Sequence, residues 1–284
     1  MINHCNAIEA ENLSLTLNSK QIFSDIHLAI PYRAVVGLVG RNGAGKSSLL
    51  RSLLGLTYST SGTSHLLACP SKKLDDHTRE RLGYVAQTPD LFSWMQCWQH
   101  IETIGLSYDN WTPTRAMNLA LKLDLPLKQK VSTLSIGDQQ KLSVVLALAH
   151  DPDLVLMDEP VASLDPVSRR DFMRAIFDDR AFDDAAIGDT ARAKEARTIL
   201  VSSHILSDLE RVVTHVAFMR QGKIQWFDEW DAISEFIRID ETQQSKSPIH
   251  KTNTGIAVID TRIEPNLASA GRVSFDDLFV FMNS

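Results

Sequence analysis

Short, continuous apolar runs stand out along this chain, with segments of helical spacing between them. The runs are Ala34–Val39, Leu154–Met157 and Thr198–Val201. Strands of a parallel sheet are covered on both faces and therefore tend to be apolar throughout, so we expect these runs to be parallel strands. The helices expected with them are Ser48–Leu54, Gln139–His150 and Pro166–Phe177. This pattern predicts an α/β fold with a mostly parallel sheet.

A helical subdomain is expected between about residues 90 and 145. Apolar residues recur there at helical spacing, namely Phe92, Trp94, Met95, Trp98, Ile101 and Ile104, and Trp111 precedes a second expected helix, Thr114–Leu123. Such side chains can fill the core of a small helical unit. Any of them that is exposed would instead mark a surface for another protein.

The pattern changes past Trp226. Glu241–Pro248 is polar and predicts a linker or hairpin tip, Gly255–Ile263 predicts a strand, and Ser274–Leu278 opens a helix with a capping-box pattern. We therefore expect a main domain over residues 1–226 and a small C-terminal α/β appendage over residues 227–284. Within the main domain, the polar stretch Asp178–Arg197 predicts a solvated extension.

Composition narrows the class of protein. The chain has 284 residues, 44% of them hydrophobic, a formal net charge of -6 and a pI near 5.8. Proteins that bind nucleic acid usually have a basic surface, so DNA and RNA are not expected partners. The three cysteines are far apart and suggest neither a zinc site nor a disulfide framework. No run approaches the ~20 apolar residues that span a bilayer, and the N-terminus does not resemble a signal peptide, so we expect no membrane span.

The first candidate site is a phosphate-binding loop. It follows the run Ala34–Val39 directly and matches the pattern G-x-x-x-x-G-K-[ST] (Walker A); its residues are Gly40, Arg41, Asn42, Gly43, Ala44, Gly45, Lys46 and Ser47, with Ser48 opening the next helix. The glycines let backbone N–H groups point at phosphates, and the helix N-terminus adds partial positive charge. Lys46 would reach the β- and γ-phosphates, and the Ser47 hydroxyl would bind Mg²⁺.

A pair of carboxylates, Asp158 and Glu159, ends the second apolar run. Groups at the carboxyl end of a parallel strand face the crevice in which ligands of α/β sheets bind. Asp158 fits the role of holding Mg²⁺ (Walker B), and Glu159 that of polarising the attacking water. Alone, such a pair would more often be a strand meeting a solvated turn, but the phosphate loop upstream favours the catalytic interpretation.

With these motifs in place, residues 8 to 226 resemble the ATP-binding subunits of ABC transporters. Further motifs follow in the order of that family: Tyr84–Gln87 resembles its Q-loop, Leu134–Gln140 its signature motif, Ser163–Asp165 its D-loop, and Ser202–His204 its switch histidine. The resemblance implies a P-loop NTPase with a RecA-like core, an N-terminal antiparallel β part and a helical subdomain.

The resemblance also implies the remaining site residues and the cofactors, ATP and Mg²⁺. Catalytic roles would belong to Glu159, His204 and Gln87, and metal binding to Ser47, Gln87 and Asp158. Two subunits would pack head to tail, so that Ser135, Gly137 and Asp165 complete the nucleotide site of the other subunit. Ser135 would direct its hydroxyl and the helix that it opens at the γ-phosphate across the interface.

The partners implied by the family are a second ATP-binding subunit, in a homodimer, and a separate integral membrane subunit. The protein would lie at the cytoplasmic face of the inner (plasma) membrane of a bacterium. The C-terminal segment Asp277–Val280 is similar to tails of ATPases that serve drug, peptide or antibiotic exporters, which favours export. Phe92 and Trp94 would receive a helix of the membrane subunit if they are exposed.

The chain departs from the family pattern at the signature motif and at the position that contacts the adenine ring. The pattern is usually L-S-G-G-Q, whereas this chain has Ile136 for the first glycine and Asp138 for the glutamine. The change would alter the hydrolysis rate or the dimer affinity while leaving the site competent. Leu17 stands where the family often has an aromatic residue against adenine, so ATP rather than GTP is implied by the family alone.

Two other functions stay open at this stage. One is a soluble, non-transport ABC ATPase that acts on protein or nucleic acid, which the acidic charge disfavours. The other is a nucleotide-gated binding module that hardly hydrolyses ATP. His204 and Asp165 also have plainer interpretations, as a solvated residue after a strand and as a helix N-cap.

Overall fold

The structure of the chain is a computed structural model. The structure describes residues 6–162, 164–177, 197–204, 209–240, 242, 244–252, 256–272 and 274–283. The polar stretch after Phe177, up to residue 196, lies outside the described residues, as do Cys5 and Ser163 of the D-loop. No helix in the described parts has both the length and the apolar character needed to cross a membrane.

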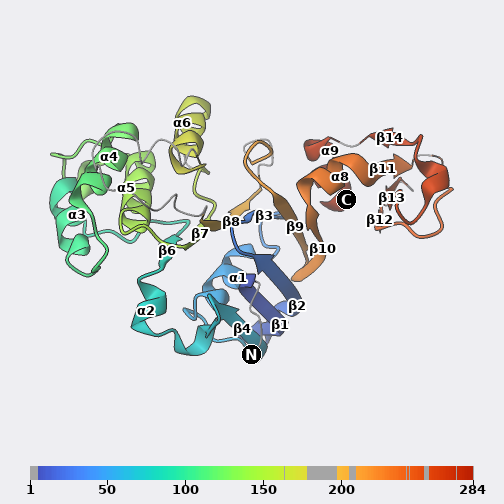
Figure 1. Ribbon diagram of the computed structural model, residues 1–284, viewed down its shortest axis with the longest axis horizontal. Helices are drawn as coiled ribbons and strands as arrows, with labels where there is room; N and C mark the ends of the chain where they lie inside the picture. The colour runs from blue at the N-terminus through green and yellow to red at the C-terminus, as the bar shows by residue number, and fades with distance from the viewer. Residues whose placement is uncertain are drawn as a thin grey trace, which may run out of the picture.

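A six-stranded, mostly parallel sheet forms the centre of the molecule (Figure 1). Its order is β10-β9-β3-β8-β7-β6, and every neighbouring pair is parallel except β9 and β10. The strands are β3 (Val35–Val39), β6 (Leu82–Val85), β7 (Leu154–Asp158), β8 (Thr198–Ser203), β9 (His215–Arg220) and β10 (Lys223–Glu229). The predicted α/β class with a mostly parallel sheet is therefore confirmed. Every residue of β7 and β8 is buried, which explains why their sequences are continuous apolar runs.

An antiparallel sheet near the N-terminus packs against the central sheet through α1 (Lys46–Leu53). Its order is β2-β1-β4-β5, with strands β1 (Asn6–Leu17), β2 (Lys20–Pro31), β4 (Ser61–Leu66) and β5 (Cys69–Pro70). Leu49 and Leu50 of α1 share one buried apolar cluster with Ile8 of β1 and Leu38 of β3. The core thus fixes the helix that begins at the phosphate loop.

Helices α3 (Cys97–Gly105), α4 (Pro113–Lys122) and α5 (Ile136–Leu148) lie beyond the β6 edge of the central sheet (Figure 1). The same part of the chain contains α2 (Asp76–Arg79), α6 (Pro166–Phe177) and the short 3₁₀ turns η1 (Ser71–Lys73) and η2 (Val131–Thr133). Ile101 of α3, Leu119 of α4 and Leu142 of α5 are buried in the same cluster, so these three helices share a core.

Two parts of the helical prediction were wrong. Of the residues at helical spacing, Phe92, Trp94 and Met95 precede the helix, which begins only at Cys97, because Gln96 and Gln99 form a capping box in which the Gln96 N–H donates to Gln99 Oε1 at 3.0 Å. The helix expected from Gln139 begins at Ile136, because the Ser135 hydroxyl accepts the N–H of Asp138 and caps the helix there.

The C-terminal part contains a third, four-stranded sheet in the order β12-β13-β11-β14. Its elements are α8 (Trp230–Phe236), β11 (Ile237–Asp240), β12 (His250–Lys251), β13 (Ala257–Asp260), η3 (Pro265–Leu267), β14 (Gly271–Arg272) and α9 (Phe275–Asn283). β13 ends at Asp260, three residues before the expected end, where Asp260 accepts hydrogen bonds from Arg262 in a turn. β10 continues to Glu229 in the central sheet, and the proposed division at residue 226 stays a prediction.

Candidate nucleotide site

The phosphate loop is the turn between β3 and α1. Gly43 and Gly45 have positive φ angles of 83° and 106°, a conformation that glycine adopts without strain. Gly40 has a different role, since a Cβ atom there would lie 2.2 Å from the Met219 carbonyl oxygen of β9. The Gly222 N–H, in the turn from β9 to β10, donates to the Ala44 carbonyl at 3.0 Å. The central sheet therefore braces the loop from one side.

The open side of the loop can receive an anion. Arg41, Asn42 and Gly43 at its tip are exposed, and Ser48 is half-buried. α1 begins with Gly45 as its N-cap, without a side-chain cap and without an acidic residue in its first turn. Its first N–H groups and the positive end of its dipole thus have no competing carboxylate on the helix itself.

Lys46 is held by a carbonyl of this loop and by a carboxylate at the end of β7. Its side chain is only 5% exposed, and Nζ donates to the Gly40 carbonyl at 2.7 Å. Nζ also lies 3.1 Å from Glu159 Oε1, in an ion pair whose carboxylate is equally buried. A buried ammonium needs such compensation because removing a charge from water is unfavourable.

Asp158 lies beside Ser47 at the carboxyl end of β7. Its Oδ1 accepts hydrogen bonds from Ser47 Oγ at 3.0 Å and from Ser202 Oγ of β8 at 2.7 Å. Its Oδ2 is buried and has no hydrogen-bond partner among the described residues. Buried polar atoms are seldom left unpaired, and Mg²⁺ prefers carboxylate, hydroxyl and water oxygens. The side chains of Ser47 and Asp158 therefore fit a Mg²⁺ site.

Glu159 is fixed in an unusual backbone conformation. Its φ angle is 48°, in the left-handed region, which is uncommon for a residue other than glycine. The Glu159 N–H donates to Ser202 Oγ at 2.9 Å, and Glu159 Oε2 lies 2.6 Å from His204 Nδ1. Such backbone strain persists only where the surroundings enforce it, and it often occurs at functional sites. The two carboxylate oxygens of Glu159 thus face Lys46 and His204.

The candidate Q-loop residue lies at the edge of this cluster. Gln87 is exposed, two positions beyond the end of β6. Gln140 of α5 donates through Nε2 to the Ala86 carbonyl at 3.2 Å, so the backbone next to Gln87 is tied to the helix of the signature motif. Gln140 was expected as the last residue of the signature motif, but its sequence context predicts no contact with the Q-loop.

Ser202 also makes contacts that its sequence context does not predict. It contacts Asp158 through its hydroxyl and receives the Glu159 N–H, so one side chain bridges both carboxylate residues. Asp158 and Ser202 are register partners in the parallel pair of β7 and β8. This relationship depends on β8 lying between β3 and β7, which chain order does not reveal.

The signature residues are not part of this cluster within the chain. The Ser135 hydroxyl donates to Asp138 Oδ2 at 2.7 Å, and Asp138 Oδ1 lies 3.3 Å from Lys141 Nζ. Gly137 is half-buried in the first turn of α5, beside the exposed Ile136. Hydrogen bonds of Ser135 run along its own helix rather than to the phosphate loop. Direct involvement in the nucleotide site would thus require a second subunit.

Asp165 and Leu17 also lie on the surface. Asp165 precedes α6 and accepts the Ser168 N–H at 3.1 Å through Oδ1, which is the N-cap interaction expected from its plainer interpretation. Leu17, at the end of β1, is 44% exposed, which leaves its side chain accessible to a ligand.

Comparison with known proteins agrees with this geometry. The sequence model of the family described as ABC transporter matches residues 23–162. The chain is 28% identical to the ABC transporter ATP-binding protein YtrB of Bacillus subtilis, covering 82% of this chain and 75% of YtrB. It is 26% identical to the bacitracin transport ATP-binding protein BcrA of Enterococcus faecalis, covering 76% of this chain and 67% of BcrA.

A solved structure shows the same fold. It is the dimeric structure of a post-hydrolysis state of the ATP-binding cassette MJ0796 bound to ADP and Pi, with a TM-score of 0.66, 19% identity, and coverage of 78% of this chain and 98% of that one. The phosphate loop, the paired carboxylates and the family match agree, and this chain belongs to the ABC transporter family as an ATP-binding ATPase subunit.

Proposed function

We propose that this chain hydrolyses ATP in a head-to-tail homodimer and thereby drives a separate integral membrane subunit, in the direction of export. The observation that carries the proposal is the buried cluster at the ends of β3, β7 and β8. There Lys46, Asp158, Glu159, Ser202 and His204 are connected by hydrogen bonds and an ion pair.

The chain's own groups account for the chemistry. Residues Gly40–Ser48 cradle the triphosphate, and Lys46 moves from Glu159 to the β- and γ-phosphates. Glu159 is then free to take the proton of the attacking water, with His204 holding its other oxygen. Ser47 and Asp158, joined by Gln87, would hold Mg²⁺, which when bound would neutralise charge on the phosphates.

The homodimer is supported by exposed polar residues at the starts of α5 and α6. Ser135 is exposed at the start of α5, and Asp165 is exposed just before α6. With Gly137 they complete the nucleotide site of the second subunit. The relative MJ0796, which shares the fold, has been described as a dimer bound to ADP and Pi.

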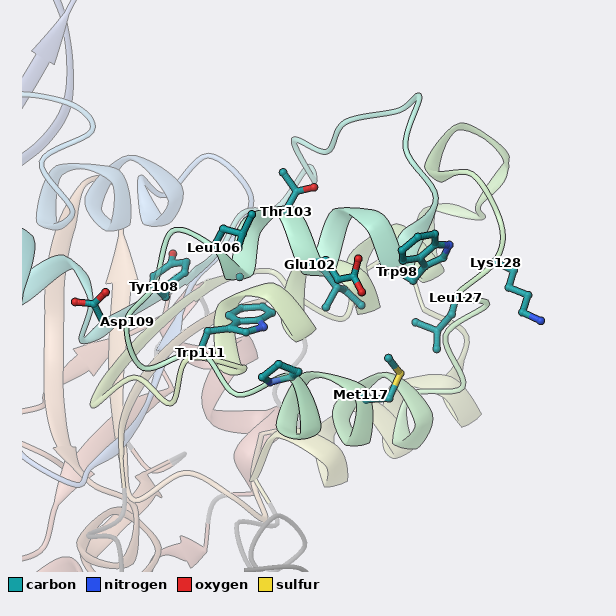
Figure 2. A pocket seen from close by; sticks show the side chains of 13 residues that line it. Trp98, Glu102, Thr103, Leu106, Tyr108, Asp109, Trp111, Met117, Leu127 and Lys128 are labelled. Atoms are coloured by element: carbon teal, nitrogen blue, oxygen red, sulfur yellow. The ribbon is translucent and has the colours of Figure 1, made fainter.

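A groove on the helical side of the molecule supports a membrane partner. The groove lies between α3, α4 and the segment that joins them and has a volume of about 1090 Å³. Figure 2 shows the side chains that line it. Its apolar lining includes Trp98, Leu106, Trp111, Met117 and Leu127. Leu106 is 90% exposed, and such apolar exposure is typical of a surface that receives another protein.

The loop before α3, which lies between Gln87 and that helix in the sequence, exposes further apolar side chains. Trp94 is 69% exposed, and Phe92 stacks on His100 of α3 at 5.1 Å between ring centroids. We infer that a short amphipathic helix of the membrane subunit docks along this face. Motion of that helix would reach Gln87 and the nucleotide through the Ala86–Gln140 contact.

Transport direction and location rest on the relatives. BcrA serves bacitracin transport, and both it and YtrB come from bacteria. We therefore place the protein at the cytoplasmic face of the bacterial inner membrane, serving the export of a drug, peptide or antibiotic. The cargo would be selected by the membrane subunit.

Co-purification tests the membrane partner. The full chain is purified from detergent-extracted membranes, and we expect one integral membrane protein in stoichiometric amount that raises the ATPase rate when both are reconstituted in vesicles. Leu106→Glu should abolish both effects and leave the ATPase activity of the isolated chain unchanged.

Leu121→Glu is the matched control. Leu121 is 66% exposed on α4 but does not line the groove. Its replacement should preserve the complex. An ATPase-active dimer that binds no membrane protein, or a complex insensitive to Leu106→Glu, would contradict the proposal and favour a soluble ABC ATPase.

A further inference from the structure

The hydroxyl of Ser135 is already engaged within its own chain. It donates to Asp138 Oδ2 at 2.7 Å and accepts the Asp138 N–H at 3.0 Å, so that both of its hydrogen-bonding functions are directed at one residue. Asp138 is held in turn by Lys141, whose Nζ lies 3.3 Å from Oδ1. Serine has a single O–H donor, so this proton is not available to another acceptor while the contact exists.

The charge of Asp138 has two opposing effects. A carboxylate in the first turn of α5 stabilises the helix through the dipole and the capping interaction. The same carboxylate repels a phosphate that approaches the helix N-terminus, and Lys141 offsets only part of this charge. Ile136, directly beside Ser135, is 65% exposed, so this turn is accessible to a second subunit.

We propose that Asp138 is a positioning residue that withholds the Ser135 hydroxyl from the γ-phosphate bound by the second subunit. Closure of the dimer then includes an exchange in which this hydroxyl leaves Asp138 and donates to the phosphate. The inference rests on the proposed function, since it requires the head-to-tail dimer. Beyond the proposed function, the inference states that the Asp138 carboxylate opposes closure of the dimer.

The test measures ATP-dependent dimerisation in a background that does not turn over. The dissociation constant of the dimer is determined for Glu159→Gln with ATP, with and without Asp138→Asn. Asparagine has nearly the same shape but no charge and is a weaker acceptor. We expect Asp138→Asn to tighten the dimer by about tenfold or more, the scale of losing one hydrogen bond to a charged group, here the one that holds the Ser135 hydroxyl.

The chain contains a matched control. At the start of α9, Ser274 Oγ donates to Asp277 Oδ2 at 2.6 Å and accepts the Asp277 N–H at 3.1 Å, which repeats the contacts of Ser135 and Asp138. Asp277→Asn therefore removes the same kind of carboxylate contact outside the nucleotide site. Like Asp138→Asn, the Asp277→Asn substitution should lower thermal stability. Unlike Asp138→Asn, it should leave the dissociation constant of the dimer unchanged.

A double-mutant cycle distinguishes exchange of the hydroxyl from a general effect of charge or stability. In a Ser135→Ala background, Asp138→Asn should tighten the dimer much less than in the presence of Ser135. An unchanged dimer constant after Asp138→Asn, an equal shift after Asp277→Asn, or an undiminished effect without Ser135 would each overturn the inference. Absence of any ATP-dependent dimer in Glu159→Gln would instead overturn the proposed function, and this inference with it.

Discussion

Lys46 Nζ and Glu159 Oε1 lie 3.1 Å apart in a buried ion pair between the phosphate loop and the end of β7. The candidate base is thus bound to the residue that is meant to hold the phosphates. Binding of a nucleotide must separate the two, which links the occupation of the loop to the release of the base.

Glu159→Gln should therefore lower the rate of ATP hydrolysis by about 10²- to 10⁴-fold, the contribution typical of a general base, while ATP binding is retained. Steady-state phosphate release and equilibrium binding of ATP measure the two effects. Glu11→Gln, an exposed position on β1, is the control. If Glu159→Gln hydrolysed ATP at the wild-type rate, Glu159 would not be the general base.

Glu159→Gln should also lower the free energy of unfolding when no nucleotide is added. Removing the carboxylate leaves the buried Lys46 with weaker compensation, and we expect a loss of about 1–3 kcal/mol in the free energy of unfolding. ATP should restore it, because phosphates replace the lost partner. Urea unfolding with and without ATP measures this effect, and equal stabilisation of wild type and variant by ATP would argue against an exchange of partners by Lys46.

Ser202→Ala should disturb both carboxylate residues at once. It removes the hydroxyl that donates to Asp158 and receives the Glu159 N–H, and hydrogen bonds to charged groups are each worth about 1.5–3 kcal/mol. We expect a fall in kcat of about 10- to 100-fold and a higher Mg²⁺ requirement. Ser64→Ala, at a buried serine of β4 in the other sheet, should change neither quantity. If the Mg²⁺ dependence of Ser202→Ala were unaltered, Ser202 would not position Asp158 for metal binding.

Gly40→Ala and Gly43→Ala should differ although both lie in the phosphate loop. A Cβ at Gly40 would collide with the Met219 carbonyl at 2.2 Å, whereas one at Gly43 would meet nothing within 4 Å. Gly43→Ala should cost only about 1–2 kcal/mol for its positive φ and keep ATP binding. Gly40→Ala should displace the loop and abolish ATP binding. Similar ATP affinities in the two variants would show that the contact with β9 does not shape the loop.

Acidification should destabilise the loop that carries Phe92. Burial lowers the pKa of His100, whose Nε2 accepts the Phe92 N–H at 3.0 Å in its neutral form. The stabilising effect of neutral His100 is therefore complete above the unfolded pKa of about 6.5 and is lost as pH falls through the lower folded pKa, at up to about 1.4 kcal/mol per pH unit.

His100→Gln should thus flatten the fall in unfolding free energy between pH 7.5 and pH 5.5. Urea titrations at both values, compared with wild type, measure this slope. His77→Gln, at an exposed position of α2, is the control and should keep the wild-type slope. Parallel slopes for His100→Gln and wild type would show that His100 does not govern the acid response.

The sequence predicted those parts of the fold and site that depend on local order along the chain. The buried parallel strands and helix α6 lie where their apolar patterns placed them, because such runs report burial directly. The loop before α3 was missed, since aromatic residues at helical spacing do not show that Gln96 caps the helix after them. The contacts of Ser202 and Gln140 were missed because they join segments 44 and 54 residues apart, and no local pattern records such contacts.

The bracing of the phosphate loop has a consequence for the thermodynamics of ATP binding. The Met219 carbonyl, the Gly222 N–H and the turn through Gly45 hold the loop in shape through backbone contacts within the chain itself. The conformational entropy of the loop is consequently lost when the chain folds, not when the nucleotide arrives. Preorganisation of this kind leaves more of the phosphate interaction available as affinity, and association need not wait for the loop to close.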